Sequence, residues 1–162
     1  MTIDLTDRAV GSPNIPESVR ALSSLPDIDY ADRFTPSTDA QAPPERWARA
    51  MFGDVPSAAE LLIWRGLLGL RLSRERSPAT VAGWQIGEQG NDWIRLEAAS
   101  WFLTANLLLQ TTQGQVSLAT FLHYDRLLAQ GVWPPLAPIH RRLVPRLLHN
   151  ATARIRAPRE DN

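Results

Sequence analysis

Three histidines are the side chains of this chain best suited to proton transfer near neutral pH. His140 falls on the apolar side of a helical pattern near the C-terminus, where a neutral imidazole could orient a ligand or move a proton. No acidic residue stands at a fixed spacing from it to form a relay, so the plainer interpretation is a histidine packed in the core. His140 is nevertheless the first candidate for a ligand-binding residue.

His123 and Asp125 are two residues apart on a predicted strand, so their side chains share one face, as two metal ligands would. A third ligand is missing from the pattern, and we expect the solvated end of a strand rather than a metal site. Tyr124 points to the other face, where it is a candidate for contact with a ligand. We predict no metal, no cofactor and no assigned catalytic residue.

Arg65 and Arg95 offer a different chemistry, because an unpaired guanidinium forms two parallel hydrogen bonds to a carboxylate or phosphate. Arg65 lies in a helical pattern that is apolar nearly all round, and Arg95 shares a strand face with Glu97. Ion pairing within the protein is the expected use of both arginines. Recognition of an acidic head group in a cavity stays open as the alternative.

Large aromatic side chains could form the wall of an apolar cavity, and the candidates are Trp64, Trp84 and Trp101. Each indole offers a wide apolar face and a single hydrogen-bond donor, which suits a cavity wall and an ordinary core equally. The sequence does not separate these two uses.

The composition excludes several kinds of enzyme. The chain of 162 residues has no cysteine, and all 17 of its basic residues are arginine. Disulfides, thiolate nucleophiles and lysine Schiff bases are therefore excluded. The acidic N-terminal third and the arginine-rich C-terminal segment balance to zero net charge, so we expect two attracting surfaces and no binding of nucleic acid.

The length and the hydropathy pattern predict one cytoplasmic domain. Residues 1–24 have scattered proline and glycine and read as a flexible leader, and residues 158–162 as a disordered tail. The N-terminus has early acidic residues and no apolar core of signal-peptide length. The longest apolar stretch, residues 61–72, is interrupted by Arg65 and Arg71 and is too short to span a membrane.

Helical patterns occupy the first half and the C-terminal end of the domain. A first strand is expected within residues 27–38, at a sheet edge. A short helix follows Pro43–Pro44 and ends at Gly53, and a second begins at a capping box of Ser57 and Glu60 and runs to about residue 72. A long helix is predicted over residues 136–156, kinked or split at Pro145.

The segment between these helices has the composition of a β-sheet. Strands are predicted at about residues 81–88, 92–98, 101–111 and 115–125. The apolar residues change from even to odd positions between 98 and 101, which requires a turn or bulge there. A helix over residues 96–110 also fits the spacing and stays open.

This order of elements resembles the START-like helix-grip (SRPBCC) superfamily of polyketide cyclases and lipid-transfer domains. The resemblance covers residues 25–157 and is carried by residues 25–30, 44–50 and 138–142, which look most like a bacterial branch of that superfamily. It implies an α+β domain in which a curved antiparallel sheet wraps around a long C-terminal helix, with two shorter helices after the first strand. It also implies an apolar cavity between the sheet and that helix.

We therefore expect a monomer or homodimer that binds a small hydrophobic or amphipathic molecule without covalent chemistry. One alternative is a cyclase, dehydratase or hydrolase of the same fold, in which His140 acts with Tyr124 or an arginine. Another alternative is a regulatory module whose core is filled and whose arginine face binds an acidic partner.

Overall fold

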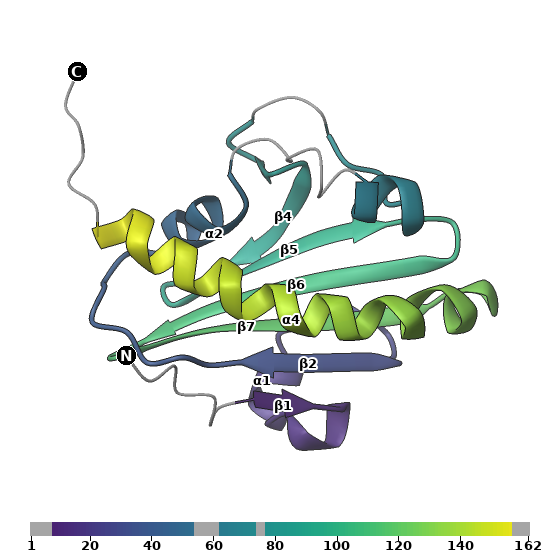
Figure 1. Ribbon diagram of the computed structural model, residues 1–162, viewed down its shortest axis with the longest axis horizontal. Helices are drawn as coiled ribbons and strands as arrows, with labels where there is room; N and C mark the ends of the chain where they lie inside the picture. The colour runs from purple at the N-terminus through teal and green to yellow at the C-terminus, as the bar shows by residue number, and fades with distance from the viewer. Residues whose placement is uncertain (1–7, 54–61, 74–76, 157–162) are drawn as a thin grey trace.

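The computed structural model describes residues 8–53, 62–73 and 77–156. It is an α+β structure in which a seven-stranded antiparallel sheet is crossed by one long C-terminal helix (Figure 1). The strands are β1 (Arg8–Val10), β2 (Tyr30–Phe34), β3 (Thr80–Val81), β4 (Trp84–Gln89), β5 (Trp93–Ala99), β6 (Leu103–Thr112) and β7 (Gln115–Tyr124), in the spatial order β1-β2-β7-β6-β5-β4-β3. The helical elements are η1 (Ser12–Asn14), α1 (Glu17–Arg20), α2 (Pro44–Phe52), the π-helical η2 (Leu62–Leu67) and α4 (Leu128–Arg156).

The predicted antiparallel meander is confirmed, and the competing helix over residues 96–110 is wrong. The single strand predicted over residues 81–88 is also wrong, because a turn at Ala82 and Gly83 divides it into β3 and β4, which pair with each other. Those residues form most of β5 and β6, which pair in register from Trp93 opposite Gln110 to Ala99 opposite Thr104. The change of register falls in the turn between the two strands, where the Ser100 amide donates to the Leu103 carbonyl oxygen at 2.7 Å. This turn resets the alternation, so the odd-numbered apolar residues of β6 face the same side as the even-numbered ones of β5.

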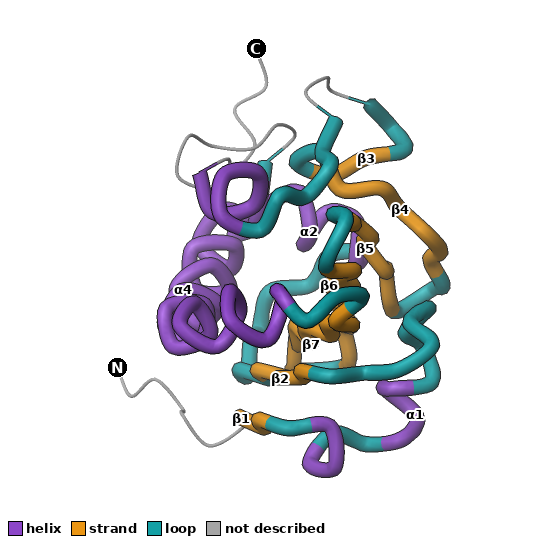
Figure 2. The backbone as a smooth tube through the Cα atoms, turned by 90° about the vertical axis from the view of Figure 1, so that its right-hand side faces the viewer, coloured by secondary structure: helices purple, strands orange, loops and turns teal. Residues whose placement is uncertain are grey.

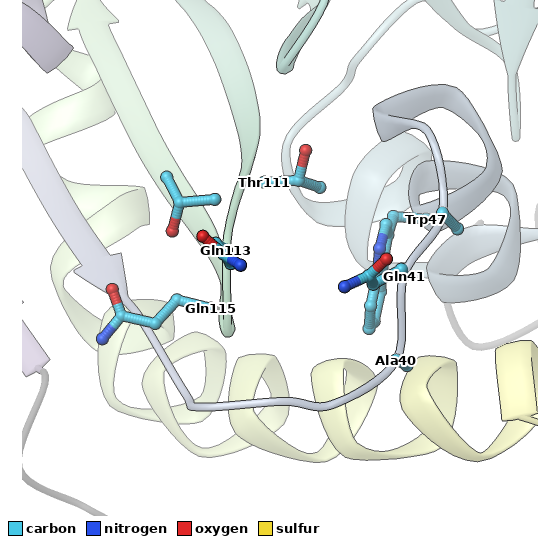
Figure 3. Close-up of a pocket in the computed structure, with 8 residues that line it drawn as sticks. Ala40, Gln41, Trp47, Thr111, Gln113 and Gln115 are labelled. Atoms are coloured by element: carbon cyan, nitrogen blue, oxygen red, sulfur yellow. The ribbon is translucent and has the colours of Figure 1, made fainter.

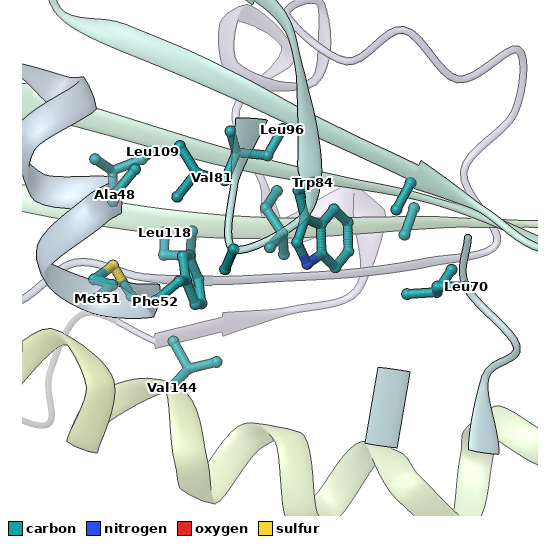
Figure 4. Packing of buried hydrophobic residues seen from close by; sticks show 14 of the residues in the cluster. Ala48, Met51, Phe52, Leu70, Val81, Trp84, Leu96, Leu109, Leu118 and Val144 are labelled. Carbon is teal, nitrogen blue, oxygen red and sulfur yellow. The ribbon is translucent and has the colours of Figure 1, made fainter. Parts of the chain in front are cut away.

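One face of the sheet, here called the inner face, is covered by α2, η2 and α4. Figure 2 shows α4 and α2 on this side and α1 on the other. The inner face and these helices share one large cluster of buried apolar side chains, part of which Figure 4 shows. Trp84 and Leu96 come from the sheet, Met51 and Phe52 from α2, and Val144 from α4.

Residues 8–24 are not only a flexible leader, because β1, η1 and α1 lie within them. β1 pairs with β2, so β2 is an inner strand and its predicted edge position is wrong. Ile15 and Val19 are buried on the outer face of the sheet against Leu108 and Phe121. Burial of these apolar side chains holds the segment in place, and a three-residue strand offers too little alternation to be detected in the sequence.

The last helix begins at Leu128 rather than at residue 136, and it includes four prolines. It continues through them without being split at Pro145. The first half of the helix has one buried side, formed by Ala129, Trp133 and Ala137. Packing of this face supports a helix whose prolines remove some of its backbone hydrogen bonds.

The two predicted shorter helices have different outcomes. α2 is confirmed, and it ends at Gly53, whose φ of 79° is typical of a helix terminus and whose amide donates to the Arg49 carbonyl oxygen. Ser57 and Glu60, the predicted capping box, lie outside the described residues. The later part of that predicted helix contains η2, which ends at Leu67.

Candidate functional site

A carboxylate lies on the inner face of β2, where the neighbouring side chains are apolar. Asp32 is 0% exposed. Tyr30 and Phe34, two positions away on either side along the strand, face the same side as Asp32. Burial of a carboxylate is costly unless other groups stabilise its charge. Its surroundings therefore form the strongest candidate for a functional site.

Residues from β2, β7 and α4 surround this carboxylate. The Tyr30 hydroxyl donates a hydrogen bond of 2.6 Å to Asp32 Oδ2, and His140 Nε2 lies 3.1 Å from the same oxygen. Thr120 of β7 is the register partner of Asp32. Trp133 lies about two helical turns before His140 on α4, and its ring centroid is 5.1 Å from that of Tyr30 and 5.3 Å from that of His140. We call these five residues the Asp32 cluster.

Four buried polar atoms of this cluster have no hydrogen-bond partner in the described part of the chain. They are Asp32 Oδ1, Thr120 Oγ1, Trp133 Nε1 and His140 Nε2, the last of which is close to Asp32 without the alignment of a hydrogen bond. Most buried polar groups in folded proteins are paired. Four unpaired donors and acceptors beside one buried carboxylate therefore require an explanation, and a polar ligand would supply the missing partners.

The protonation of Tyr30 follows from its surroundings. Burial of the phenol, followed by the charge of Asp32 and the hydrogen bond to it, raises the pKa of Tyr30 well above its ordinary value of 10. Arg141 has its Nη1 3.4 Å from the hydroxyl and acts in the opposite direction, but it does not reverse the shift. Tyr30 therefore keeps its proton at ordinary pH and remains a donor to Asp32.

Among the predicted site residues whose side chains the structure describes, His140 is the one that lies in this cluster. Its acidic partner, Asp32, was missed because the two residues are far apart in the sequence and meet only where α4 crosses β2. The sequence did contain a signal for Asp32, since this aspartate shares one face of a strand with the large apolar rings of Tyr30 and Phe34. An acid at such a position is exceptional unless it has a partner.

His123 belongs to a separate group on the outer face. Its Nδ1 lies 3.2 Å from Asp29 Oδ2 and its Nε2 lies 3.4 Å from Asp125 Oδ1, so the ring is between two carboxylates. The Thr104 hydroxyl donates to Asp125 Oδ2 at 2.6 Å. Within residues 8–53, 62–73 and 77–156, no three side chains are arranged to hold a metal ion. On the inner side, burial and the charge of Asp29 raise the pKa of Tyr124.

The arginine candidates differ in what the structure shows. Arg95 lies on the outer face, where its Nε donates to Glu97 Oε1 at 3.0 Å and its Nη1 donates to the Leu22 carbonyl oxygen at 2.8 Å. The expected ion pair with Glu97 is therefore confirmed, and Arg95 faces away from α4. The side chain of Arg65 lies outside the described part of the chain.

The three predicted tryptophans are also in different places. Trp64 of η2 and Trp84 of β4 pack edge to face, with centroids 5.4 Å apart, in the inner cluster that also includes side chains of α2. Trp101 is 61% exposed in the turn between β5 and β6, so it lines no part of the interior. The predicted strand over residues 101–111 begins two residues too early, since β6 begins at Leu103 and Trp101 lies in the turn before it.

A hollow of about 290 Å³ lies near the turn between β6 and β7, away from all the predicted site residues (Figure 3). Gln41, Gln113 and Gln115 line it together with Trp47, and Figure 3 shows these amides around its opening. Its described lining is uncharged.

No protein-family model, no curated protein and no solved structure matches this chain. None of the described helices combines the length and the apolar character that crossing a bilayer requires.

Proposed function

We propose that this protein binds a small amphipathic molecule whose polar end is held by the Asp32 cluster, between β2, β7 and α4. The observation that carries the proposal is the group of four buried polar atoms without partners around one buried carboxylate. The resemblance to the helix-grip superfamily supports the same location, since ligands of that fold lie between the sheet and the last helix.

The polar atoms define the chemistry of the molecule. Asp32 Oδ1 accepts hydrogen bonds, Trp133 Nε1 donates one, and the Thr120 hydroxyl does either. A ligand with a hydroxyl or amino group beside a carbonyl or ether oxygen satisfies all three atoms. The rings of Tyr30 and Trp133 provide an apolar surface for the remainder of the molecule.

Acid–base catalysis at the same cluster is the second candidate function. The 3.1 Å separation of His140 Nε2 from Asp32 Oδ2 favours it, because an imidazole that transfers a proton in an enzyme commonly has a carboxylate beside it. The reaction would be that of a cyclase, dehydratase or hydrolase acting on a carbonyl compound. In that case His140→Ala retains ligand binding and loses turnover.

The first experiment is native mass spectrometry of the purified protein, with extraction and identification of any small molecule that it carries. We expect an adduct that is lost in Asp32→Asn and weakened in His140→Gln. The matched controls are Asp125→Asn and His123→Gln, which make the same chemical changes on the outer face. A protein without an adduct that also binds no member of a panel of fatty acids, phenols and amino alcohols would refute the proposal.

A further inference from the structure

Large apolar side chains are exposed together at one end of the molecule. Leu127 is 81% exposed, Trp101 61%, Leu67 47% and Leu128 46%. They come from three separate parts of the chain: the turn between β5 and β6, the end of η2 and the start of α4. We call these four residues the apolar tip.

Backbone contacts hold these three parts side by side. The amides of Asp125 and Arg126, just before α4, donate to the Phe102 carbonyl oxygen at 3.0 and 3.2 Å. Gly69, two residues after η2, lies beside the β5–β6 turn, since a Cβ added to it would be 3.6 Å from the side chains of Phe102 and Ser100. Figure 1 shows η2, the β5–β6 turn and the start of α4 together at the right-hand end of the molecule. The tip is therefore one surface and not four scattered residues.

Two arginines flank the tip. The Arg71 amide donates to the Ala99 carbonyl oxygen, which places Arg71 beside the turn that carries Trp101, and Arg126 directly precedes Leu127. Both arginines are exposed, and neither forms an ion pair with another residue that the structure describes. The nearest acid in sequence, Asp125, already accepts a hydrogen bond from Thr104 and lies beside His123.

The combination selects one kind of partner. Tryptophan and leucine projecting from turns enter the interface of a bilayer, where the indole is at the level of the head groups. Exposed arginines beside them are attracted to anionic lipids. The turn, the end of η2 and the start of α4 lie together at one end of the domain, where all four apolar side chains can meet a lipid layer at once.

We propose that the apolar tip docks this protein on an anionic membrane surface, with Trp101 and Leu127 inserted among the lipids and with Arg71 and Arg126 at the head groups. This attachment is peripheral and independent of the function proposed for the Asp32 cluster. Burial of an indole and an isobutyl group in the interface accounts for the affinity, and the arginines account for the choice of anionic lipid.

The test is cosedimentation of the full chain with vesicles of phosphatidylcholine alone and with about 30% phosphatidylserine. We expect binding to the anionic vesicles that falls at about 0.5 M NaCl, where the Debye length is a few ångströms. Trp101→Ser with Leu127→Ser should lower the partition coefficient at least about tenfold. Arg71→Gln with Arg126→Gln should lower it by roughly tenfold for anionic vesicles only.

Ile139→Ser is the matched control, because Ile139 is also a large apolar side chain, 50% exposed, but lies on α4 outside the apolar tip. It should leave the partition coefficient unchanged. Absence of binding to both vesicle types, or binding that the tip variants do not weaken, would overturn the proposal. A dimer in sedimentation velocity that the Trp101→Ser and Leu127→Ser variant dissociates, without lipid binding, would assign the tip to a second copy of the chain instead. Circular dichroism of each variant verifies that it is folded.

Discussion

Replacement of Tyr30 by phenylalanine tests the Asp32 cluster most directly. The substitution keeps the ring beside Trp133 and His140 and removes only the hydroxyl, which donates a hydrogen bond of 2.6 Å to Asp32 Oδ2. A hydrogen bond to a charged group contributes about 1.5–3 kcal/mol. Because Asp32 is fully buried, water cannot replace the lost donor from the open surface. We expect Tyr30→Phe to lower the free energy of unfolding by about 2 kcal/mol at neutral pH.

The same variant predicts a change at alkaline pH. Burial and Asp32 raise the pKa of Tyr30 in the folded protein above its unfolded value of 10. The folded state therefore holds this proton more tightly, and the corresponding stability is fully present below pH 10 and is lost as pH rises above it. One such tyrosine removes about 1.4 kcal/mol of stability between about pH 8 and pH 11. Tyr30→Phe should lack this loss.

The composition makes the measurement unusually clean. The chain has no lysine and no cysteine, so its two tyrosines are the side chains that titrate in this range. Urea unfolding followed by far-ultraviolet circular dichroism at about pH 8 and pH 11 gives both free energies. Tyr124→Phe is the control, since it removes the other tyrosine and leaves the Asp32 cluster intact. Equal stability and equal alkaline loss in the wild type and Tyr30→Phe would refute the proposed role of the hydroxyl.

Three further substitutions test the packing around the sheet, each by urea unfolding. Asn106→Ala should lower the free energy of unfolding by about 1–3 kcal/mol, because Oδ1 of the fully buried Asn106 accepts hydrogen bonds from residues 23–24. An unchanged urea midpoint would mean that these hydrogen bonds do not hold residues 23–24 against the sheet. Leu148→Ala should lower the free energy of unfolding by about 2–5 kcal/mol, because it leaves a cavity between α4 and the core. A decrease below about 1 kcal/mol would contradict that packing. Gly83→Ala should lower the free energy of unfolding by at least about 1–3 kcal/mol, since residue 83 has a φ of +87° and its new Cβ would lie 2.5 Å from a backbone oxygen. This loss should exceed that of Gly114→Ala, because Gly114 has a similar φ but open space around it.

The sheet was predictable because one of its faces is buried. Alternation along β6 assigns Leu103, Leu107 and Leu109 to one side, and the structure buries all three in the inner cluster. A shift by one residue would expose them to water, so the pattern specifies the register strongly. The same reasoning located the turn between β5 and β6, although no glycine marks it.

The two ends of the domain were harder because their structure depends on tertiary contacts. β1 is three residues long and exists through its pairing with β2. The first half of α4 contains Pro134, Pro135 and Pro138, which on local propensity argue against a helix. Burial of Trp133 and Ala137 against the domain outweighs that penalty. Neither contact is visible within a short window of sequence.

One residue of the candidate site, His140, was predictable from the sequence, and its partner Asp32 was not. Helical spacing identified His140 as an inward-facing residue of the last helix. Asp32 was assigned to an edge strand, where a carboxylate is exposed and unremarkable, and the addition of β1 converts that strand into an inner one. Once β2 is an inner strand under α4, the same aspartate becomes a buried charge that requires partners.

A comparison within the molecule favours His140 over His123 as a residue of the candidate functional site. Both rings lie close to carboxylates, at 3.1 Å for His140 and at 3.2 and 3.4 Å for His123. The carboxylates beside His123 have side chains 39% and 35% exposed, so water screens their charge and the group contributes little. Asp32 is 0% exposed, and its charge acts on its neighbours at a lower effective dielectric constant. Of the two groups, the inner one therefore has the stronger electrostatic effect on its neighbours, and the two histidines provide a matched test of the proposed site.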